Sequence, residues 1–228
     1  MKNIYDGLLQ FRGTWRTYQE RVLANSQKYL EDGKVHIVAA PGSGKTTLGI
    51  ELIRRLGAPA LILSPSITIR QQWLERIEDG FFVKGAEPEE FLSNDLKAMK
   101  SITAITYQAL YSAMKHYQGE LAEEDGDAAE DGEGAGARET ESVDFRDFDL
   151  FEAVKAAGVR VVCLDEAHHL RSEWWKALEA FLKEAKGMTL ISLTATPPYD
   201  STPAQWKRYI DLCGPIDEEI FTPELVRE

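Results

Sequence analysis

The chain has 228 residues, of which 43% are hydrophobic, and its formal net charge is −12. It has no apolar run of the roughly 18 residues that a membrane span needs, no apolar stretch typical of a secretory signal near its start, and only two cysteines, Cys163 and Cys213. These features exclude a membrane-spanning protein and a disulfide-stabilised secreted domain, and they predict a cytoplasmic protein with reduced thiols.

The acidic residues are concentrated in one segment. Residues 119–149 hold 13 Asp and Glu and 2 Arg side chains, a net charge of −11, so the rest of the chain carries −1. The segment is rich in Glu, Asp, Gly and Ala, and it has too little apolar surface to offset the entropy of ordering it. We therefore expect a disordered acidic insertion at about residues 119–144, and the overall acidity does not exclude a nucleic-acid partner.

The first predicted elements are a helix and a strand. Apolar residues recur at helical spacing between positions 11 and 30, and Ile37-Val38-Ala39-Ala40 form a short apolar run that predicts a buried strand. The next residues read PGSGKTT at 41–47, which predicts a tight glycine-containing turn that opens directly into a helix.

This turn predicts a phosphate site. Backbone N–H groups, the start of a helix and the Lys45 ammonium would converge there and favour negative charge. Thr46 could ligate a Mg²⁺ ion that bridges phosphates. The pattern departs from the Walker A sequence at Ala39, where that sequence has glycine, so an ordinary strand-to-helix turn remains an alternative at this point.

Strand and helix patterns continue to alternate up to the acidic segment. Residues 46–56 have one apolar face and end before Gly57, residues 60–63 predict a second buried strand, and residues 67–77 predict a helix. Residues 101–106 alternate like a strand and lead into a helix that begins at Tyr107. The stretch between them is ambiguous and could hold a short strand at 81–83 and a polar helix over 89–100.

The alternation returns after the acidic segment. Helices are predicted over 145–157, 174–185 and 203–212, and strands over 159–164, 188–193 and 216–220. Apolar strands that alternate with helices predict an α/β fold, in which a parallel sheet is covered by helices on both faces to give three layers.

Four predicted strands end in polar, chemically capable residues. These are Lys45 and Thr46, Ser64 and Pro65, Asp165 and Glu166, and Thr194 and Thr196. Ligands bind at the carboxyl ends of the strands in open α/β sheets, so we expect these ends to form a single site. Asp165 is placed to hold Mg²⁺ opposite Thr46, and Glu166 to orient or deprotonate an attacking water.

Two other pairs of residues have ordinary explanations. The adjacent histidines His168 and His169 point apart, and no cysteine or further histidine lies at ligand spacing, so they do not predict a zinc site. Trp174 and Trp175 fit a core and an interface better than a platform for base stacking.

Together these motifs resemble the N-terminal RecA-like motor domain of superfamily-two DNA and RNA helicases and translocases, which has the P-loop NTPase fold. AAPGSGKT at 39–46, DEAH at 165–168 and TAT at 194–196 resemble motifs I, II and III in the order of the family, which often has alanine where Ala39 stands. RTYQ at 16–19 looks like the Q-motif region, SP at 64–65 with RQQW at 70–73 resembles motif Ia, and TYQ at 106–108 resembles the next nucleic-acid motif. The resemblance covers about residues 10–221 and is greatest to helicase-like subunits of restriction and defence systems and to repair helicases.

The resemblance implies a role for each matching residue. The catalytic residues would be Lys45, Asp165 and Glu166, with Thr46 and Asp165 as the Mg²⁺ ligands. ATP would be bound by Arg16, Gln19, Pro41, Gly42, Ser43, Gly44, Lys45, Thr46 and Thr47, with Gln19 reading the adenine edge. His168, Thr194 and Thr196 would couple the nucleotide state to nucleic acid, which Ser64, Pro65, Arg70, Thr106 and Tyr107 would contact.

Motors of this family contain a second RecA-like domain with an arginine finger. No second phosphate turn or arginine-rich helix follows the third motif before Glu228. We therefore expect residues 1–228 to be a single ATP-binding domain that needs a second RecA-like domain, from a longer chain or a partner subunit, and that alone hydrolyses ATP slowly. We expect DNA to be the nucleic acid along which the motor moves, and RNA is the less favoured alternative. A nucleotide-gated binding module, or another P-loop ATPase or kinase, are the alternatives.

Overall fold

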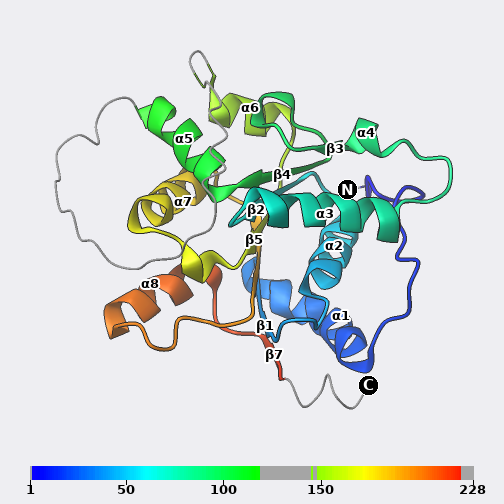
Figure 1. The fold of residues 1–228 in the computed structure, drawn as a ribbon, viewed down its shortest axis with the longest axis horizontal. Coiled ribbons are helices and arrows are strands. Elements are labelled where there is room, and N and C mark those ends of the chain that lie inside the picture. The colour runs from blue at the N-terminus through cyan, green and yellow to red at the C-terminus, as the bar shows by residue number, and fades with distance from the viewer. Residues whose placement is uncertain (1, 119–144, 146–147, 222–228) are drawn as a thin grey trace.

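The computed structural model describes residues 2–118, 145 and 148–221, and the predicted acidic insertion lies outside them. Seven strands form one sheet in the order β3-β4-β2-β5-β6-β1-β7, and every neighbouring pair is parallel (Figure 1). The strands are β1 (Lys34–Ala39), β2 (Ala60–Ser64), β3 (Leu92–Ser93), β4 (Ile102–Thr106), β5 (Val161–Asp165), β6 (Thr189–Thr194) and β7 (Glu218–Ile220).

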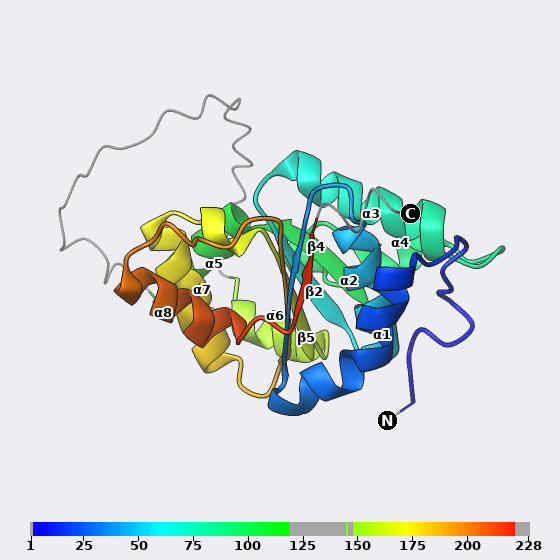
Figure 2. The same ribbon diagram turned by 90° about the horizontal axis from the view of Figure 1, so that it is seen from below.

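Helices cover both faces of this sheet (Figure 2). On one face lie α1 (Thr17–Tyr29), α2 (Lys45–Leu56) and α3 (Ile67–Phe81), and on the other lie α5 (Tyr107–Gln118), α6 (Leu150–Ala156), α7 (Ser172–Glu184) and α8 (Pro203–Cys213). The remaining short helices are α4 (Pro88–Phe91), η1 (Leu30–Asp32), η2 (Leu96–Ala98) and η3 (Ala167–His169).

The strands are apolar throughout because each contributes to two cores. In β5, Cys163 packs into the core under α1, α2 and α3, whereas Leu164 packs into the core under α5 to α8. Successive strand residues point to opposite faces, so a strand that is covered on both sides reads as a continuous apolar run. The predicted three-layer α/β fold is therefore confirmed. Cys163 and Cys213 are buried free thiols, as expected.

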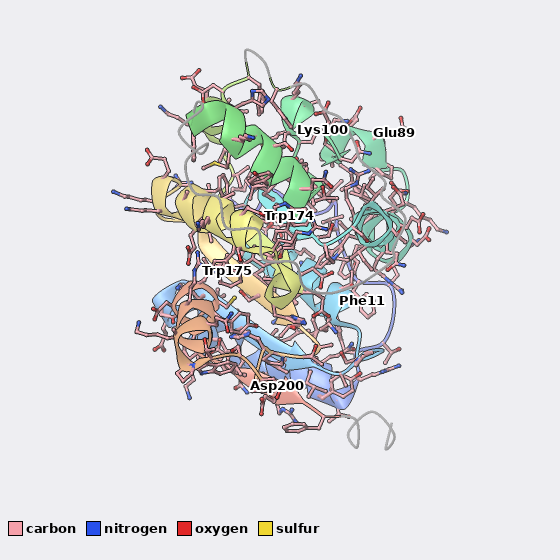
Figure 3. All side chains as sticks on the ribbon, turned by 60° about the vertical axis from the view of Figure 1, so that its left-hand side comes forward. Phe11, Glu89, Lys100, Trp174, Trp175 and Asp200 are labelled. Carbon is pink, nitrogen blue, oxygen red and sulfur yellow. The ribbon has the colours of Figure 1, made fainter. Side chains whose placement is uncertain are left out.

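The prediction of a polar helix over 89–100 was wrong. The stretch holds the single turn of α4, the two-residue strand β3 and the 3₁₀ turn η2, and the Lys100 ammonium donates a hydrogen bond to the Glu89 carbonyl oxygen (Figure 3). The Ser93 hydroxyl oxygen accepts from the Asp95 N–H, and the Asp95 carboxylate accepts from the Lys97 N–H. Such local side-chain bonds to the backbone compete with helix formation and divide the segment.

Other boundaries also differ from the predictions, most clearly at α3 and α6. Helix α3 continues to Phe81, and Phe82 then forms an isolated antiparallel bridge with Leu9 instead of the short strand predicted at 81–83. The helix predicted over 145–157 is α6, which begins only after Asp149, whose carboxylate accepts from two N–H groups of the first turn. None of the helices in the described ranges has both the length and the apolar character that a membrane span requires.

Candidate functional site

The predicted phosphate turn joins β1 to α2 at the carboxyl edge of the sheet. Gly42 and Gly44 both have a φ of 80°, in the left-handed region that side chains other than glycine rarely adopt. A Cβ atom at Gly44 would also lie 2.5 Å from Nε2 of Gln19. The backbone conformation therefore favours glycine at position 44, and a larger residue there would also displace the Gln19 amide from the turn.

The start of α1 holds this turn from one side. The Tyr18 hydroxyl and the Gln19 side-chain amide donate to the Ser43 carbonyl oxygen, at 2.9 Å and 3.0 Å. The Arg16 guanidinium donates to the Gly42 carbonyl oxygen at 3.3 Å, and the backbone N–H of Arg16 donates to Oε1 of Gln19 at 3.1 Å. Gln19 is buried and both ends of its amide contact protein, so here it supports the turn, and its predicted contact with adenine stays a prediction.

The groups at the turn fit a phosphate. The Ser43 hydroxyl is buried and has no hydrogen-bond partner among the described residues, which is rare for a buried polar group. The Lys45 ammonium donates to the Ala39 carbonyl oxygen at 3.0 Å and lies 3.2 Å from Oε1 of Glu166. Phosphate oxygens would satisfy the Ser43 hydroxyl, the first N–H groups of α2 and the Lys45 ammonium together.

Asp165 is the last residue of β5 and is 7% exposed. Its Oδ2 accepts a hydrogen bond from the indole N–H of Trp73 at 2.8 Å, and its carbonyl oxygen accepts from the Tyr107 hydroxyl at 3.1 Å. Burial raises the pKa of Asp165 to about 6, against the opposing effects of the Trp73 hydrogen bond and the Lys45 charge, while the charge of Glu166 adds to the increase. The carboxylate is thus held in place, and because burial leaves its negative charge poorly solvated, a cation beside it would be stabilising.

Glu166 follows with a strained backbone. Its φ is 52°, the one positive φ outside glycine in the described part of the chain. The carboxylate accepts from the Thr194 hydroxyl at 2.7 Å and from the Ala195 N–H at 2.9 Å. Burial alone would raise the pKa of Glu166, but these hydrogen bonds and the Lys45 charge outweigh it, so the pKa lies below its ordinary value. Glu166 is therefore ionised near neutral pH.

The three predicted coupling residues form one hydrogen-bonded chain that ends on Glu166. Nδ1 of His168 lies 2.7 Å from the Thr194 hydroxyl, and Nε2 lies 3.1 Å from the Thr196 hydroxyl. One arrangement of protons satisfies every contact: Thr196 donates to Nε2, Nδ1–H donates to Thr194, and Thr194 donates to Glu166. The end of β6 is thereby linked to the carboxylate beside Lys45.

A metal at this site would depend on the nucleotide. In the ranges that the structure describes, no group of three or more His, Cys, Asp or Glu could hold a metal ion by itself. Thr46 and Asp165 supply the oxygen ligands that Mg²⁺ prefers, and Mg²⁺ ordinarily completes its shell with phosphate oxygens and water. The residues therefore fit a Mg²⁺ ion that enters with a phosphate ligand.

Most of the predicted nucleic-acid residues have buried side chains, and their contact with nucleic acid stays a prediction. Tyr107 is buried against Asp165, and the side chains of Ser64, Arg70 and Thr106 are also buried, at 0%, 5% and 7% exposure. The Thr106 hydroxyl accepts from the Ala109 N–H at the start of α5. Of the five residues, Pro65 alone is partly exposed, so these side chains organise the two loops and leave any contact to the backbone and to their neighbours.

Trp73 and Tyr18 are site residues that the sequence reasoning missed. Trp73 was considered only as part of the RQQW motif, and Tyr18 only as part of RTYQ. The available signal was chemical: a tryptophan on the apolar face of a helix requires an acceptor for its N–H once it is buried. The identity of that acceptor could not be inferred from the neighbouring sequence.

A separate cavity of about 210 Å³ lies beside His168, between α7 and α8. Trp175 lines it, on the α7 helix where Figure 3 labels it, together with Arg208 and Tyr209 of α8. Arg208 lies over the Trp175 ring and pairs with Glu179. None of the phosphate-turn residues lines this cavity, so it is distinct from the phosphate site.

We expect Asp165→Asn to stabilise the fold at neutral pH. In the folded state the pKa of Asp165 is about 6, above its ordinary 3.8, so between these values the folded protein binds more protons than the unfolded chain and its stability falls as pH rises. An asparagine has no carboxyl group to ionise, so the variant does not lose this stability as the pH rises. Its side-chain oxygen can still accept the hydrogen bond from the Trp73 N–H. The free energy of unfolding should therefore favour the variant by about 2–3 kcal/mol above pH 6 and by close to zero below pH 4. Urea unfolding of the variant and the wild type across this pH range measures the difference in their free energies of unfolding. A difference that does not change with pH would contradict a raised pKa at Asp165.

Comparison with known proteins matches most of the chain to a family model. The family model described as "Type III restriction enzyme, res subunit" matches residues 12–199. The "Putative helicase 055L" of Frog virus 3 (isolate Goorha) is 32% identical over 87 residues, which are 36% of this chain and 20% of that protein.

Solved helicase structures share the fold. The Hef helicase domain of Pyrococcus furiosus has a TM-score of 0.59 at 18% identity, over 93% of this chain and 40% of that one. The UvsW helicase of bacteriophage T4 has a TM-score of 0.57 at 12% identity, over 94% and 62%. A hypothetical ATP-dependent RNA helicase of Sulfolobus tokodaii has a TM-score of 0.56 at 15% identity, over 92% and 53%. The chain therefore spans less than two thirds of each of these proteins.

Proposed function

Because the chain belongs to the family of the type III restriction enzyme Res subunit and has the RecA-like fold of helicase motor domains, we propose that it is the ATP-binding first motor domain of an ATP-dependent nucleic-acid helicase or translocase. The observation that carries the proposal is the 3.2 Å approach of the Lys45 ammonium to Glu166. That contact joins the phosphate turn to the carboxylates at the end of β5, on the edge where an open parallel sheet binds ligands.

The phosphate turn binds and orients the triphosphate of ATP. Backbone N–H groups at the start of α2, the Ser43 hydroxyl and the Lys45 ammonium hold phosphate oxygens. Thr46 and Asp165 are the protein ligands of Mg²⁺, which neutralises charge on the phosphates when it is bound. Arg16, Tyr18 and Gln19 fix the turn from α1 and leave its N–H groups directed at the ligand.

Glu166 orients the attacking water. Its carboxylate is held by the Thr194 hydroxyl and the Ala195 N–H, so it presents an acceptor at a fixed place. A carboxylate whose pKa lies below its ordinary value is a weak base, so orientation of the water is a larger part of its role than removal of a proton. The hydrogen bonds between His168 and Thr194 and between Thr194 and Glu166 connect the loop after β6 to this carboxylate.

Nucleic acid is the proposed track, with DNA preferred to RNA. The loop after β2, at Pro65, and the junction between β4 and α5, at Thr106, lie at the same edge of the sheet as the ATP site, because these strands are parallel neighbours in the order β4-β2-β5. Backbone groups in such loops contact phosphates without reading sequence. A second RecA-like domain, from the same protein or from a partner, completes the motor.

Alanine substitution of Thr194 and Thr196 tests the motor. The chain should bind Mg·ATP weakly and hydrolyse it slowly, because an arginine finger normally supplies about 10³–10⁵ in rate. The double variant should retain Mg·ATP binding and lose any effect of single-stranded DNA on hydrolysis. A fluorescent ATP analogue reports binding, and phosphate release with and without DNA reports turnover. Thr202→Ala, which removes a hydroxyl that caps α8, is the matched control.

Each contrary outcome has a distinct meaning. No binding of the ATP analogue by the wild type would overturn the proposal. Binding without hydrolysis would favour a nucleotide-gated binding module, and a double variant that responds to DNA like the wild type would favour another kind of P-loop ATPase. Robust DNA-stimulated turnover by residues 1–228 would refute the need for a second domain.

A further inference from the structure

The side chain of Trp73 connects α3 to the proposed metal ligand. Trp73 is fully buried, and its indole N–H donates to Oδ2 of Asp165 at 2.8 Å. Among the described residues this is the hydrogen bond that reaches the Asp165 carboxylate. It leaves Oδ1 for a metal ion or a metal-bound water. Because an indole has one N–H in the plane of a rigid ring, the direction of this bond follows the position of the whole side chain.

The ring is held by the elements that carry the rest of the ATP site. A Cβ atom at Gly49 of α2 would lie 2.6 Å from Cη2 of Trp73 and 2.7 Å from Cδ1 of Leu193. The indole therefore fills the space that the glycine leaves between α2, which begins at Lys45, and β6, which ends at Thr194. A shift of the ring would disturb packing against both, so its position is strongly determined.

A second aromatic residue holds the backbone of the same aspartate. Tyr107, the first residue of α5, is 2% exposed, and its hydroxyl donates to the Asp165 carbonyl oxygen at 3.1 Å. Trp73 belongs to the helix that follows the β2 loop, and Tyr107 begins the helix that follows β4 directly. Both segments proposed to contact nucleic acid are thus connected to Asp165 by one hydrogen bond each.

We propose that Trp73 and Tyr107 are positioning residues that hold Asp165 in the orientation that binds Mg²⁺ and that connect it to the two segments proposed to contact nucleic acid. The inference rests on the proposed function, because it takes Asp165 as the Mg²⁺ ligand. Both residues act through Asp165, to which they donate their hydrogen bonds. Residues that orient a metal ligand typically change metal affinity or activity by about 10–100-fold when they are removed.

The test measures how nucleotide binding depends on Mg²⁺. Fluorescent mant-ATP is titrated into the full 228-residue chain at a series of Mg²⁺ concentrations. In Trp73→Phe the Mg²⁺ concentration for half-maximal binding should rise about 10–100-fold. In Tyr107→Phe, which removes one hydroxyl, it should rise about fivefold. Binding of mant-ATP in EDTA should stay close to that of the wild type in both variants, because the phosphate turn is unchanged.

Matched controls separate this role from general loss of packing. Trp175→Phe removes an indole N–H that donates to Glu179, and Tyr5→Phe removes a buried hydroxyl bonded to the Ala58 and Ser101 carbonyl oxygens. Both should leave the Mg²⁺ dependence unchanged. A further variant carries β-(3-benzothienyl)alanine at position 73, which keeps the ring shape and replaces the N–H by sulfur. This variant should show the raised Mg²⁺ concentration for half-maximal binding that is expected of Trp73→Phe. Because the ring shape is kept, it tests the proposal even if the phenylalanine variant folds poorly.

The connection to the loops has its own readout. Single-stranded DNA should change the Mg²⁺ concentration for half-maximal mant-ATP binding in the wild type and should fail to do so in the benzothienyl variant. A wild type that binds no mant-ATP would overturn the proposed function. A wild type with Mg²⁺-dependent binding, together with position-73 variants that keep the wild-type dependence, would overturn this inference and leave the proposed function in place.

Discussion

Glu166→Gln is expected to slow ATP hydrolysis by about 10²–10⁴-fold while Mg·ATP binding stays within about twofold of the wild type. The wild-type carboxylate accepts from the Thr194 hydroxyl and the Ala195 N–H, and a glutamine oxygen can accept both bonds, so the local backbone should be preserved. What is lost is the negative charge that orients the attacking water. The loss should therefore appear in kcat and hardly in the affinity for ATP.

The pH dependence of the same reaction gives a second check. Hydrogen bonds and the Lys45 charge outweigh burial and hold the pKa of Glu166 below its ordinary value of 4.5, so the reaction should lose no rate through protonation of this carboxylate near neutral pH. Glu179→Gln, which alters a carboxylate paired with Arg208 away from the turn, is the control and should leave kcat unchanged. Equal losses of kcat and of ATP affinity in Glu166→Gln would show that the residue serves binding instead of water orientation.

Lys45→Ala is expected to weaken Mg·ATP binding by about 10²-fold or more, since removing one partner of a buried charge pair typically costs about 2–5 kcal/mol. Two effects add. The phosphates lose the ammonium at the turn, and Glu166, 3.2 Å from Nζ, becomes an unbalanced negative charge beside them. Titration with mant-ATP in Mg²⁺ measures the change, and Lys207→Ala, at an exposed lysine on α8, controls for loss of a positive charge alone.

A double variant separates the two effects of losing Lys45. Lys45→Ala combined with Glu166→Gln should bind Mg·ATP more tightly than Lys45→Ala does, because the repulsion from Glu166 is removed. A double variant no tighter than the single one would show that the lost ammonium accounts for the whole effect. Unchanged binding in Lys45→Ala itself would contradict the phosphate site.

Local sequence signals were enough for the fold class and for the centre of the site. Apolar runs identified the strands, and the glycines at 42 and 44 marked a turn that only a left-handed backbone can make. Polar residues after the strands were predicted to meet at one edge, and Lys45 and Glu166 do so. These predictions succeeded because parallel strands place their carboxyl ends together whatever their order in the sheet.

The prediction of a polar helix over 89–100 missed for a local and a distant reason. The side chains of Ser93 and Asp95 accept hydrogen bonds from the nearby backbone, and Leu92 pairs with β4 and has a buried side chain. The sequence did not indicate that Ser64, Arg70 and Tyr107 are buried, because the packing of the following helices over these strands decides their exposure. The packing of α1 also decided that the Gln19 amide donates to the Ser43 carbonyl oxygen, while its expected contact with adenine stays a prediction.

The amino-acid sequence alone settled that strands and helices alternate, where the phosphate turn lies and which carboxylates follow the central strand, because each depends on residues adjacent along the chain. The tertiary structure decided the strand order and the partners of those carboxylates. Trp73 and Asp165 are 92 positions apart, and they meet only because β2 and β5 are neighbours and α3 packs behind them. A hydrogen bond of that kind follows from which apolar faces bury each other, and no pattern within one segment contains that information.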